Sequence, residues 1–231
     1  MQPRAEEFLH LLNRLDEHLK QHVHRSEGRG FMMRAEVAAR QDPALQRYLS
    51  ELREFSELRN AIVHYREFPA EIIAEPTEAA LDRLREIVDY IINPPRLLPT
   101  FASAVKCWAP NDQLLDALHF MDKQGHSQLP VYSAGAMALL SSDGIARWLA
   151  GCAQETVSLA GRTVADVLPF EKAGGFALMR GDATVEVARQ AFHTALGRGQ
   201  RLRAVLVTAD GKPAAKLQGI VTAADLLQKQ R

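Results

Sequence analysis

A hydroxyl and a carboxylate close to the C-terminus form the first candidate binding pair. Thr222 follows an apolar run that ends at Val221, and Asp225 comes three residues later, about one helical turn away. If a helix begins here, its first backbone N–H groups have no partner inside the helix. Together with the Thr222 hydroxyl they can face an anion such as phosphate. The alternative is structural: Thr222 caps the helix and Asp225 complements its dipole.

A second polar set lies near the end of a predicted long helix, within residues 57–65. Asn60 and His64 are four positions apart and share one helix face, and Arg59 lies next to that face. A His can act as a general base, and an Arg can stabilise negative charge that develops in a reaction. The alternative is a hydrogen-bonded contact between helices, with His64 favoured near a helix C-terminus by the dipole.

Two weaker signals involve side chains that bind metals. His18 and His22 are four positions apart, with His24 close behind, which is a spacing found in metal sites. No third ligand follows at a fixed spacing, so we favour a solvated helix face and predict no metal. Cys107 and Cys152 are too few and too far apart for a disulfide framework or a zinc site. They favour a reducing compartment and buried structural thiols.

Composition narrows the class of protein. The chain has 231 residues, 47% of them hydrophobic, which is enough for two ordinary cores. Its 28 basic and 28 acidic residues balance, so no overall field draws it to nucleic acid or to an anionic membrane. Charges interrupt the N-terminal apolar residues, and no apolar run approaches the roughly 20 residues that span a bilayer. We therefore expect a soluble cytoplasmic protein with no membrane partner.

The N-terminal part of the chain has the apolar spacing of helices. Apolar residues recur at steps of three and four from Phe8 to Val23, which predicts an amphipathic helix. With it, the predicted helices cover residues 4–24, 32–40, 43–64 and 81–91. The double proline at 94–95 ends the last of them. These patterns predict an all-α N-terminal helical bundle.

Beyond residues 94–100 the pattern changes to short β-branched runs, glycine turns and short helices, which predicts a domain boundary. This second part repeats itself in the order strand, helix, strand, strand, helix. After the first strand, the helix, the two strands and the closing helix are expected at 114–124, 129–132, 138–141 and 145–149 in the first copy. In the second copy the same four elements are expected at 185–196, 204–207, 219–222 and 226–229. Neither α+β copy can cover its own sheet, so we expect the copies to pack against each other.

The second copy contains two short sequence motifs, Val207-Thr208-Ala209-Asp210-Gly211 and Gly219-Ile220-Val221-Thr222-Ala223-Ala224-Asp225-Leu226-Leu227. They resemble the strand, turn, strand and closing helix of CBS domains, and Leu129-Pro130-Val131 is similar to the family's strand entry in the first copy. The resemblance assigns residues 97–231 to an α+β tandem CBS pair, or Bateman module, with repeats at about 101–150 and about 165–231. It implies a regulatory site for an adenine nucleotide (AMP, ADP or ATP) or S-adenosylmethionine, and no catalytic cofactor.

In proteins with this motif, the carboxylate that matches Asp225 accepts hydrogen bonds from ribose hydroxyls. Arg203 is similar in position to a residue that reaches the phosphates. The ligand-binding set predicted from the resemblance is Thr222, Asp225, Arg203, Val221 and Ser141.

The first copy departs from this pattern. Ser141 matches Thr222, but Gly144 stands where Asp225 would be. Asp143 comes one residue early, which turns a side chain by roughly 100° on a helix. One competent site is therefore expected, in the second copy, and Gly144→Asp is expected to restore another.

Arg59, Asn60 and His64 resemble the motif of HEPN domains, and the likeness extends loosely over residues 1–96. Many HEPN domains are dimeric, metal-independent ribonucleases, while others only bind RNA or protein partners. The resemblance implies a catalytic set in which His64 takes a 2′-hydroxyl proton and Arg59 stabilises the phosphorane-like charge. This part of the chain has no basic excess and no aromatic platform for RNA.

Two hypotheses follow. In the first, the CBS pair senses an adenosyl ligand and biases a helical partner-binding domain, and the protein is not an enzyme. In the second, the helical domain is an endoribonuclease that the pair controls. They differ in whether Arg59 and His64 of two subunits face each other across a cleft. Broad apolar faces in both halves predict a homodimer.

Overall fold

The computed structural model describes residues 3–23, 30–64, 74–152 and 158–228. The chain divides into two units, Met1–Pro95 and Arg96–Arg231, which we call the helical unit and the repeat unit. In the described residues the helical unit has helices and no strands, and the repeat unit mixes helices with two small sheets. The fold class predicted from the sequence, an all-α bundle followed by an α+β pair of repeats, is confirmed.

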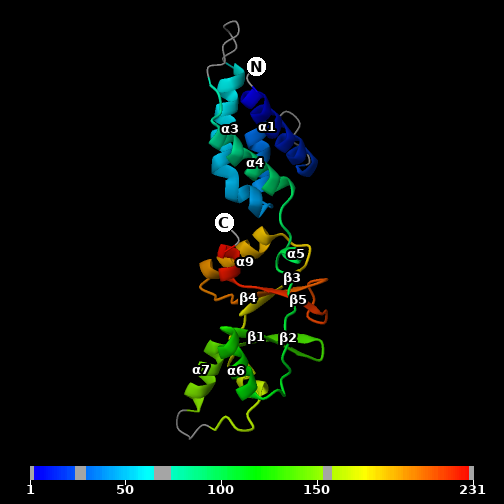
Figure 1. The fold of residues 1–231 in the computed structure, drawn as a ribbon, viewed down its shortest axis with the longest axis vertical. Helices are drawn as coiled ribbons and strands as arrows, with labels where there is room; N and C mark the ends of the chain where they lie inside the picture. Colours follow the sequence, from blue (N-terminus) through cyan, green and yellow to red (C-terminus); the bar gives the residue numbers. More distant parts are fainter. Residues whose placement is uncertain (1–2, 24–29, 65–73, 153–157, 229–231) are drawn as a thin grey trace. The chain divides into compact units, whose positions relative to one another are not determined.

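The helical unit contains α1 (Pro3–His22), α2 (Phe31–Ala39), α3 (Pro43–His64) and α4 (Glu78–Ile92), shown in blue to green in Figure 1. α1 packs against each of the other three helices, and α3 also contacts α2 and α4. The core contains the predicted stripe of α1 and the matching faces of α3 and α4. Its almost inaccessible members include Phe8, Leu15, Leu19, Leu45, Leu52, Leu81, Leu84 and Ile87.

Local sequence sets the ends of these helices. Asp42 Oδ1 accepts a hydrogen bond from the backbone N of Ala44 at 2.8 Å, next to a proline at the first position of α3. Thr77 Oγ1 accepts one from the backbone N of Ala80 at 3.2 Å and so caps α4. α4 ends at Ile92, before the double proline that cannot continue a helix. His24, the last residue of the first predicted helix, lies outside the described residues.

The repeat unit contains the two predicted copies. The first has α6 (Leu114–Gln124), β1 (Gln128–Ser133), β2 (Ala136–Ser141) and α7 (Ser142–Gly151). The second has β3 (Phe176–Arg180), α9 (Val185–Gly197), β4 (Ala204–Thr208), β5 (Leu217–Val221) and α10 (Ala223–Gln228). β1 and β2 are antiparallel, whereas the central β4 of the second sheet pairs parallel with β3 and antiparallel with β5.

The first strand of the predicted repeat is complete only in the second copy, as β3. In the first copy a single parallel bridge joins Trp108 to Val131. The backbone N of Trp108 donates to the carbonyl of Pro130 at 2.9 Å, and the backbone N of Tyr132 donates to the carbonyl of Trp108 at 2.8 Å. Pro110 follows almost at once, and because it lacks an N–H it cannot extend this ladder.

The two copies exchange their entry segments. The segment before the first copy includes α5 (Leu97–Thr100), and its Leu97 is buried in the core of the second copy. The segment after the first copy includes α8 (Val164–Val167) and the 3₁₀ turn η1 (Leu168–Phe170). Val164 and Val167 are buried in the core of the first copy. The linker that the sequence pattern left unplaced therefore completes the first copy rather than merely joining the two.

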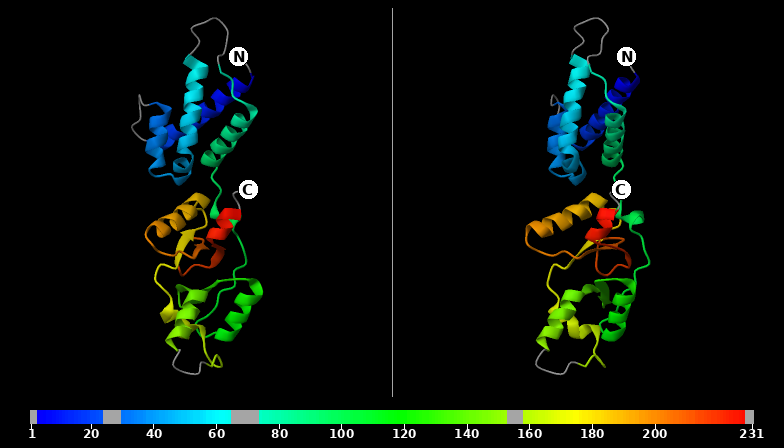
Figure 2. Two further views of the ribbon diagram at one scale, coloured as in Figure 1. Left: turned by 90° about the vertical axis from the view of Figure 1, so that its left-hand side faces the viewer. Right: turned by 60° about the vertical axis from the view of Figure 1, so that its left-hand side comes forward.

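The copies also pack against each other through their sheets, as expected. Leu139 of β2 is buried in one cluster with Ala204 and Leu206 of β4 and Leu217 of β5. Figures 1 and 2 show α9 and α10 on the outer side of the second sheet, and α6 and α7 on the outer side of the first. Asp143 in the first turn of α7 accepts hydrogen bonds from Arg201 and Arg203, which precede β4, so the start of α7 lies at the boundary between the copies.

Candidate ligand-binding site

A cavity of about 740 Å³ lies at the boundary between the two copies, within the size range of small-molecule sites. The first copy contributes residues 125–128, which connect α6 to β1. The second copy contributes residues 201–203 before β4 and residues 222–225 at the start of α10. Thr222, Asp225 and Arg203 of the predicted set thus line one cavity.

Thr222 and Asp225 form a reciprocal cap at the start of α10. Asp225 Oδ2 accepts hydrogen bonds from the backbone N of Thr222 at 2.8 Å and from Thr222 Oγ1 at 2.7 Å. Thr222 Oγ1 in turn accepts one from the backbone N of Asp225 at 3.4 Å. The structural role that the sequence allowed is therefore present. Asp225 Oδ1 accepts no hydrogen bond from the described residues.

Arg203 is held by a carboxylate from the other copy. Arg203 Nη2 donates to Asp143 Oδ2, and Arg201 Nη1 donates to the same oxygen at 3.1 Å. The hydrogen bond from Arg203, together with the charges of both arginines and Arg147, holds the pKa of Asp143 below its ordinary value. Asp143 of the first copy thus supplies a counter-ion to two arginines of the second copy.

The formal charges around this cavity balance. Arg201 and Arg203 contribute two positive charges, while Asp143 and Asp225 contribute two negative ones. An incoming phosphate would therefore compete with Asp143 for the two guanidinium groups. No sequence pattern linked these residues, because Asp143 and Arg203 are 60 positions apart and belong to different copies.

The other two residues of the predicted ligand-binding set lie elsewhere. The Val221 side chain is fully buried in the core of the second copy and does not line the cavity. Ser141 is also fully buried. Its backbone N donates to Glu171 Oε1 at 2.6 Å, and its Oγ donates to Glu171 Oε2 at 2.8 Å.

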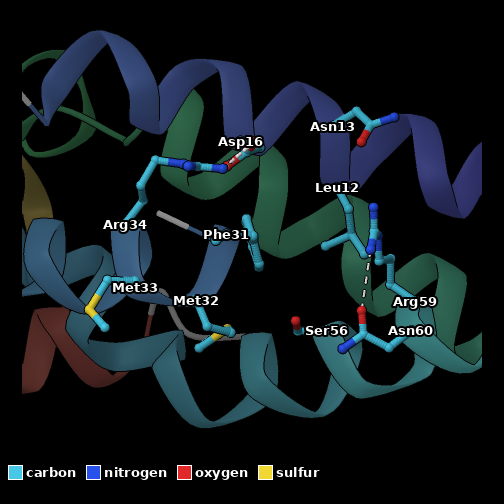
Figure 3. A pocket seen from close by; sticks show the side chains of 11 residues that line it. Leu12, Asn13, Asp16, Phe31, Met32, Met33, Arg34, Ser56, Arg59 and Asn60 are labelled. Carbon is cyan, nitrogen blue, oxygen red and sulfur yellow. Dashed lines mark hydrogen bonds and ion pairs between the residues drawn. The ribbon is translucent and has the colours of Figure 1, made fainter. Parts of the chain in front are cut away.

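The helical unit has a second cavity, of about 480 Å³, between α1, α2 and α3 (Figure 3). Arg59 and Asn60 both line it, and Arg59 Nη1 donates to Asn60 Oδ1 at 3.2 Å. Across the cavity Arg34 forms a partly buried, bidentate ion pair with Asp16, with hydrogen bonds of 2.8 and 2.7 Å. His64 is the last residue of α3, and its side chain lies outside the described part of the chain.

The histidines of α1 and the two cysteines are the weaker candidates from the sequence. His22 Nδ1 lies 2.8 Å from the backbone carbonyl of His18, and the two rings are 4.3 Å apart. Burial, and secondarily the charge of His22, lower the pKa of His18. No cluster of three His, Cys, Asp or Glu side chains suited to a metal occurs among the described residues. Cys107 is exposed rather than buried, and Cys152 is half-buried.

No family model and no curated protein matches this chain. Several solved structures are similar to it. A CBS domain-containing protein of unknown function from Kribbella flavida is 18% identical, with 59% of this chain and 98% of that one aligned at a TM-score of 0.45. CBSX2 in complex with AMP is 20% identical over 59% of this chain and 99% of that one, with a TM-score of 0.42.

A third similar structure is a CBS-domain pair in complex with 5′-methylthioadenosine and S-adenosyl-L-methionine. It is 16% identical over 59% of this chain and 96% of that one, with a TM-score of 0.45. Within the described residues, none of the helices combines the length and the apolar character needed to cross a membrane.

Proposed function

We propose that the repeat unit is a CBS-type pair that senses an adenine nucleotide or a related adenosyl ligand at a single site in its second copy. The observation that supports this most strongly is the cavity that Thr222, Asp225 and Arg203 line together. These residues were assigned to one ligand from the sequence alone, and Arg203 lies in a different segment from the other two.

Each part of such a ligand has a suitable partner in the cavity. Asp225 Oδ1 accepts hydrogen bonds from the ribose hydroxyls, since Oδ2 is already used by Thr222. Arg201 and Arg203 bind the phosphate, with charge-assisted hydrogen bonds that replace those to Asp143. Leu202 and Ile220 supply apolar lining for the base.

Ligand binding then changes a contact between the copies. Asp143 lies in the first turn of α7, and it holds the segment before β4 through Arg201 and Arg203. A phosphate that takes over the arginines releases this link, so the ligand favours a different arrangement of the two copies. For a phosphorylated ligand, the sensor function rests on this exchange of one anion for another.

In this proposal the helical unit is a partner-binding domain, and ligand binding to the repeat unit shifts its arrangement. The connection is short in the chain: α4 ends at Ile92, and Leu97 is already anchored in the core of the second copy. The backbone N of Leu97 donates to the carbonyl of Ala183 at 2.8 Å, and Arg96 Nη1 donates to the carbonyl of Asp182 at 2.7 Å. A shift within the second copy is therefore passed to a segment directly attached to α4.

A thermal-shift panel tests this function. The panel contains AMP, ADP, ATP and S-adenosylmethionine, which include ligands named for two of the similar structures. A ligand present at 100 times its dissociation constant stabilises the fold by about 2.7 kcal/mol. We expect at least one member to raise the melting temperature of the wild type and to raise that of Asp225→Ala much less. A panel without any shift would contradict the proposal.

The ribonuclease hypothesis for Arg59, Asn60 and His64 stays a prediction. The hydrogen bond between Arg59 and Asn60 is of the internal kind that the structural alternative requires. Both side chains also line the cavity of the helical unit, where a polar group could reach them. Cleavage or binding of RNA by this unit is open to the direct test given in the Discussion.

A further inference from the structure

A carboxylate occupies the same position in both copies, but it comes from different parts of the chain. In the second copy Asp225 accepts hydrogen bonds from the backbone N and the hydroxyl of Thr222, at 2.8 and 2.7 Å. In the first copy Glu171 accepts hydrogen bonds from the backbone N and the hydroxyl of Ser141, at 2.6 and 2.8 Å. From outside α7, Glu171 thus binds the two groups that Asp225 binds from within α10, although Glu171 uses both of its oxygens and Asp225 uses only Oδ2.

The glycine at position 144 provides the space for this carboxylate. The backbone N of Gly144 donates to Ser141 Oγ at 3.1 Å, as the backbone N of Asp225 does to Thr222 Oγ1 at 3.4 Å. A Cβ atom built on Gly144 would lie 1.9 Å from Glu171 Oε1 and 2.3 Å from its Cδ. Any side chain at position 144 therefore competes with Glu171 for the same volume.

The position is closed in the first copy and open in the second. Ser141 has no exposed surface, whereas Thr222 is half-buried and lines the cavity of about 740 Å³. Gly144 is buried, whereas Asp225 is half-buried. Glu171 therefore covers the place where a ligand of the first copy would contact Ser141.

Neighbouring contacts fix Glu171 in this place. It follows directly after η1, whose Leu168 packs against the core of the first copy. Arg147 Nε donates to the carbonyl of Phe170 at 2.7 Å, and Arg147 Nη2 lies 3.7 Å from Glu171 Oε2. The side chain of Glu171 is only 16% exposed, so a bound ligand could not reach Ser141 without displacing it.

We propose that Glu171 is a built-in occupant of the ligand position of the first copy: it supplies the carboxylate that Gly144 lacks and closes that position to nucleotide. The ligand-binding part of this inference rests on the proposed function, whereas the placement of Glu171 does not. One consequence revises the expectation drawn from the sequence. Gly144→Asp alone does not restore a second site, because Glu171 already fills the space.

A double-mutant cycle between Gly144 and Glu171 tests the placement without any ligand. The chain has two tryptophans, Trp108 and Trp148, and both are buried in the core of the first copy. Thermal unfolding followed by tryptophan fluorescence on the full chain therefore reports on this copy. The variants are Gly144→Ala, Glu171→Ala and their combination. Asp116→Ala, which removes an exposed carboxylate of α6, is the matched control partner for Glu171→Ala.

We expect the effect of Gly144→Ala on the melting temperature to change sign when Glu171 is removed. Gly144→Ala lowers the melting temperature when Glu171 is present, because the added methyl group overlaps its carboxylate. It raises the melting temperature in the Glu171→Ala background, since alanine is favoured over glycine within a helix and the space is then free. In the Asp116→Ala background it lowers the melting temperature as in the wild type. If Gly144→Ala has the same effect with and without Glu171, the proposal is wrong.

Calorimetry of the wild type with AMP tests the second half of the proposal. The expected result is one equivalent of AMP per chain, bound more weakly by Asp225→Ala. Two equivalents per chain would overturn the closure of the first copy. If AMP, ADP, ATP and S-adenosylmethionine all fail to bind, the proposed function fails, and the fluorescence cycle still decides where Glu171 lies.

Discussion

Arg203 of the second copy donates a hydrogen bond to Asp143 of the first copy. The residue predicted to bind a phosphate is therefore already paired with a carboxylate. The Arg203 side chain is 13% exposed and that of Asp143 is 40% exposed. Asp143 is the exposed partner, so a ligand phosphate can replace it on Arg203 without leaving a buried charge uncompensated. Asp143 links the two copies, and under the proposed function we expect it also to tune the affinity of the site for phosphate.

Asp143→Asn should tighten the binding of phosphorylated ligands. Removing the competing charge is expected to favour AMP by about 1 kcal/mol, or roughly fivefold in the dissociation constant. Adenosine, which has no phosphate, should bind the variant and the wild type equally. Parallel titrations of the two ligands separate this effect from a general change in the cavity. Equal shifts for AMP and adenosine would contradict the role given to Asp143.

The stability difference between wild type and Asp143→Asn should depend on pH. The pKa of Asp143 is lowered on folding, mainly by the hydrogen bond from Arg203. A carboxylate of this kind contributes stability above its unfolded pKa of about 3.9 and loses it as the pH falls through the lower folded value. The difference between wild type and Asp143→Asn should therefore stay constant from neutral pH down to about pH 5 and disappear only in stronger acid. Melting temperatures across that range check this, and a difference that fades near neutrality would refute it.

Asp225→Ala should have two separable effects. The loss of the ribose contact is expected to weaken AMP binding by about 1.5–3 kcal/mol. Because Asp225 also pairs with Thr222 at the start of α10, the ligand-free stability should fall as well, by roughly 0.5–2 kcal/mol. An AMP analogue without ribose hydroxyls identifies the first effect, since it should bind the variant and the wild type alike. If the analogue also loses affinity in the variant, Asp225 acts through α10 alone.

The homodimer stays a prediction, and the repeat unit offers a surface for it. Leu196 of α9 and Leu227 of α10 are 75% and 65% exposed, and a groove of about 330 Å³ lies between them. Light scattering should give about twice the chain mass of 25.7 kDa. Replacing both leucines by glutamate should shift the mass toward the monomer if this face forms the dimer. A wild-type monomer at micromolar concentration would also remove the basis for a dimeric ribonuclease.

His64→Ala decides between the two hypotheses for the helical unit. A metal-independent ribonuclease would cut single-stranded RNA in the presence of a chelator, and loss of its general base would slow the reaction by roughly 10²–10⁴-fold. The regulatory reading predicts no cleavage by wild type, His64→Ala or Arg59→Ala, with or without nucleotide. Cleavage by the wild type that both variants abolish would establish the enzyme. Filter binding that falls steeply with salt would instead indicate a non-catalytic RNA cleft.

The sequence predicted Thr222 and Asp225 from their short-range spacing and Arg203 from the resemblance to CBS domains. Thr222 and Asp225 are three residues apart, so the strand-to-helix pattern alone placed them together. The contacts that it missed join distant segments: Ser141 and Glu171 are 30 positions apart, and Asp143 and Arg203 are 60. Glu171 lies in the linker between the copies, where no repeat pattern specifies its partner.

In the fold, too, the sequence predicted the short-range features and missed the contacts between distant segments. Helical spacing and the double proline predicted the bundle and its end, because these signals act within a few residues. The exchange of entry segments was not predictable in this way. It depends on which copy offers a cavity for Leu97 and for Val164, and only the assembled cores specify that.

Isothermal titration calorimetry of the full chain with AMP, ADP, ATP and S-adenosylmethionine bears most directly on the proposed sensor role. We predict that at least one of them binds with one equivalent per chain and that Asp225→Ala weakens this binding. A wild-type protein that takes up none of the four at millimolar concentration, and whose melting temperature none of them raises, would contradict the assignment of the cavity.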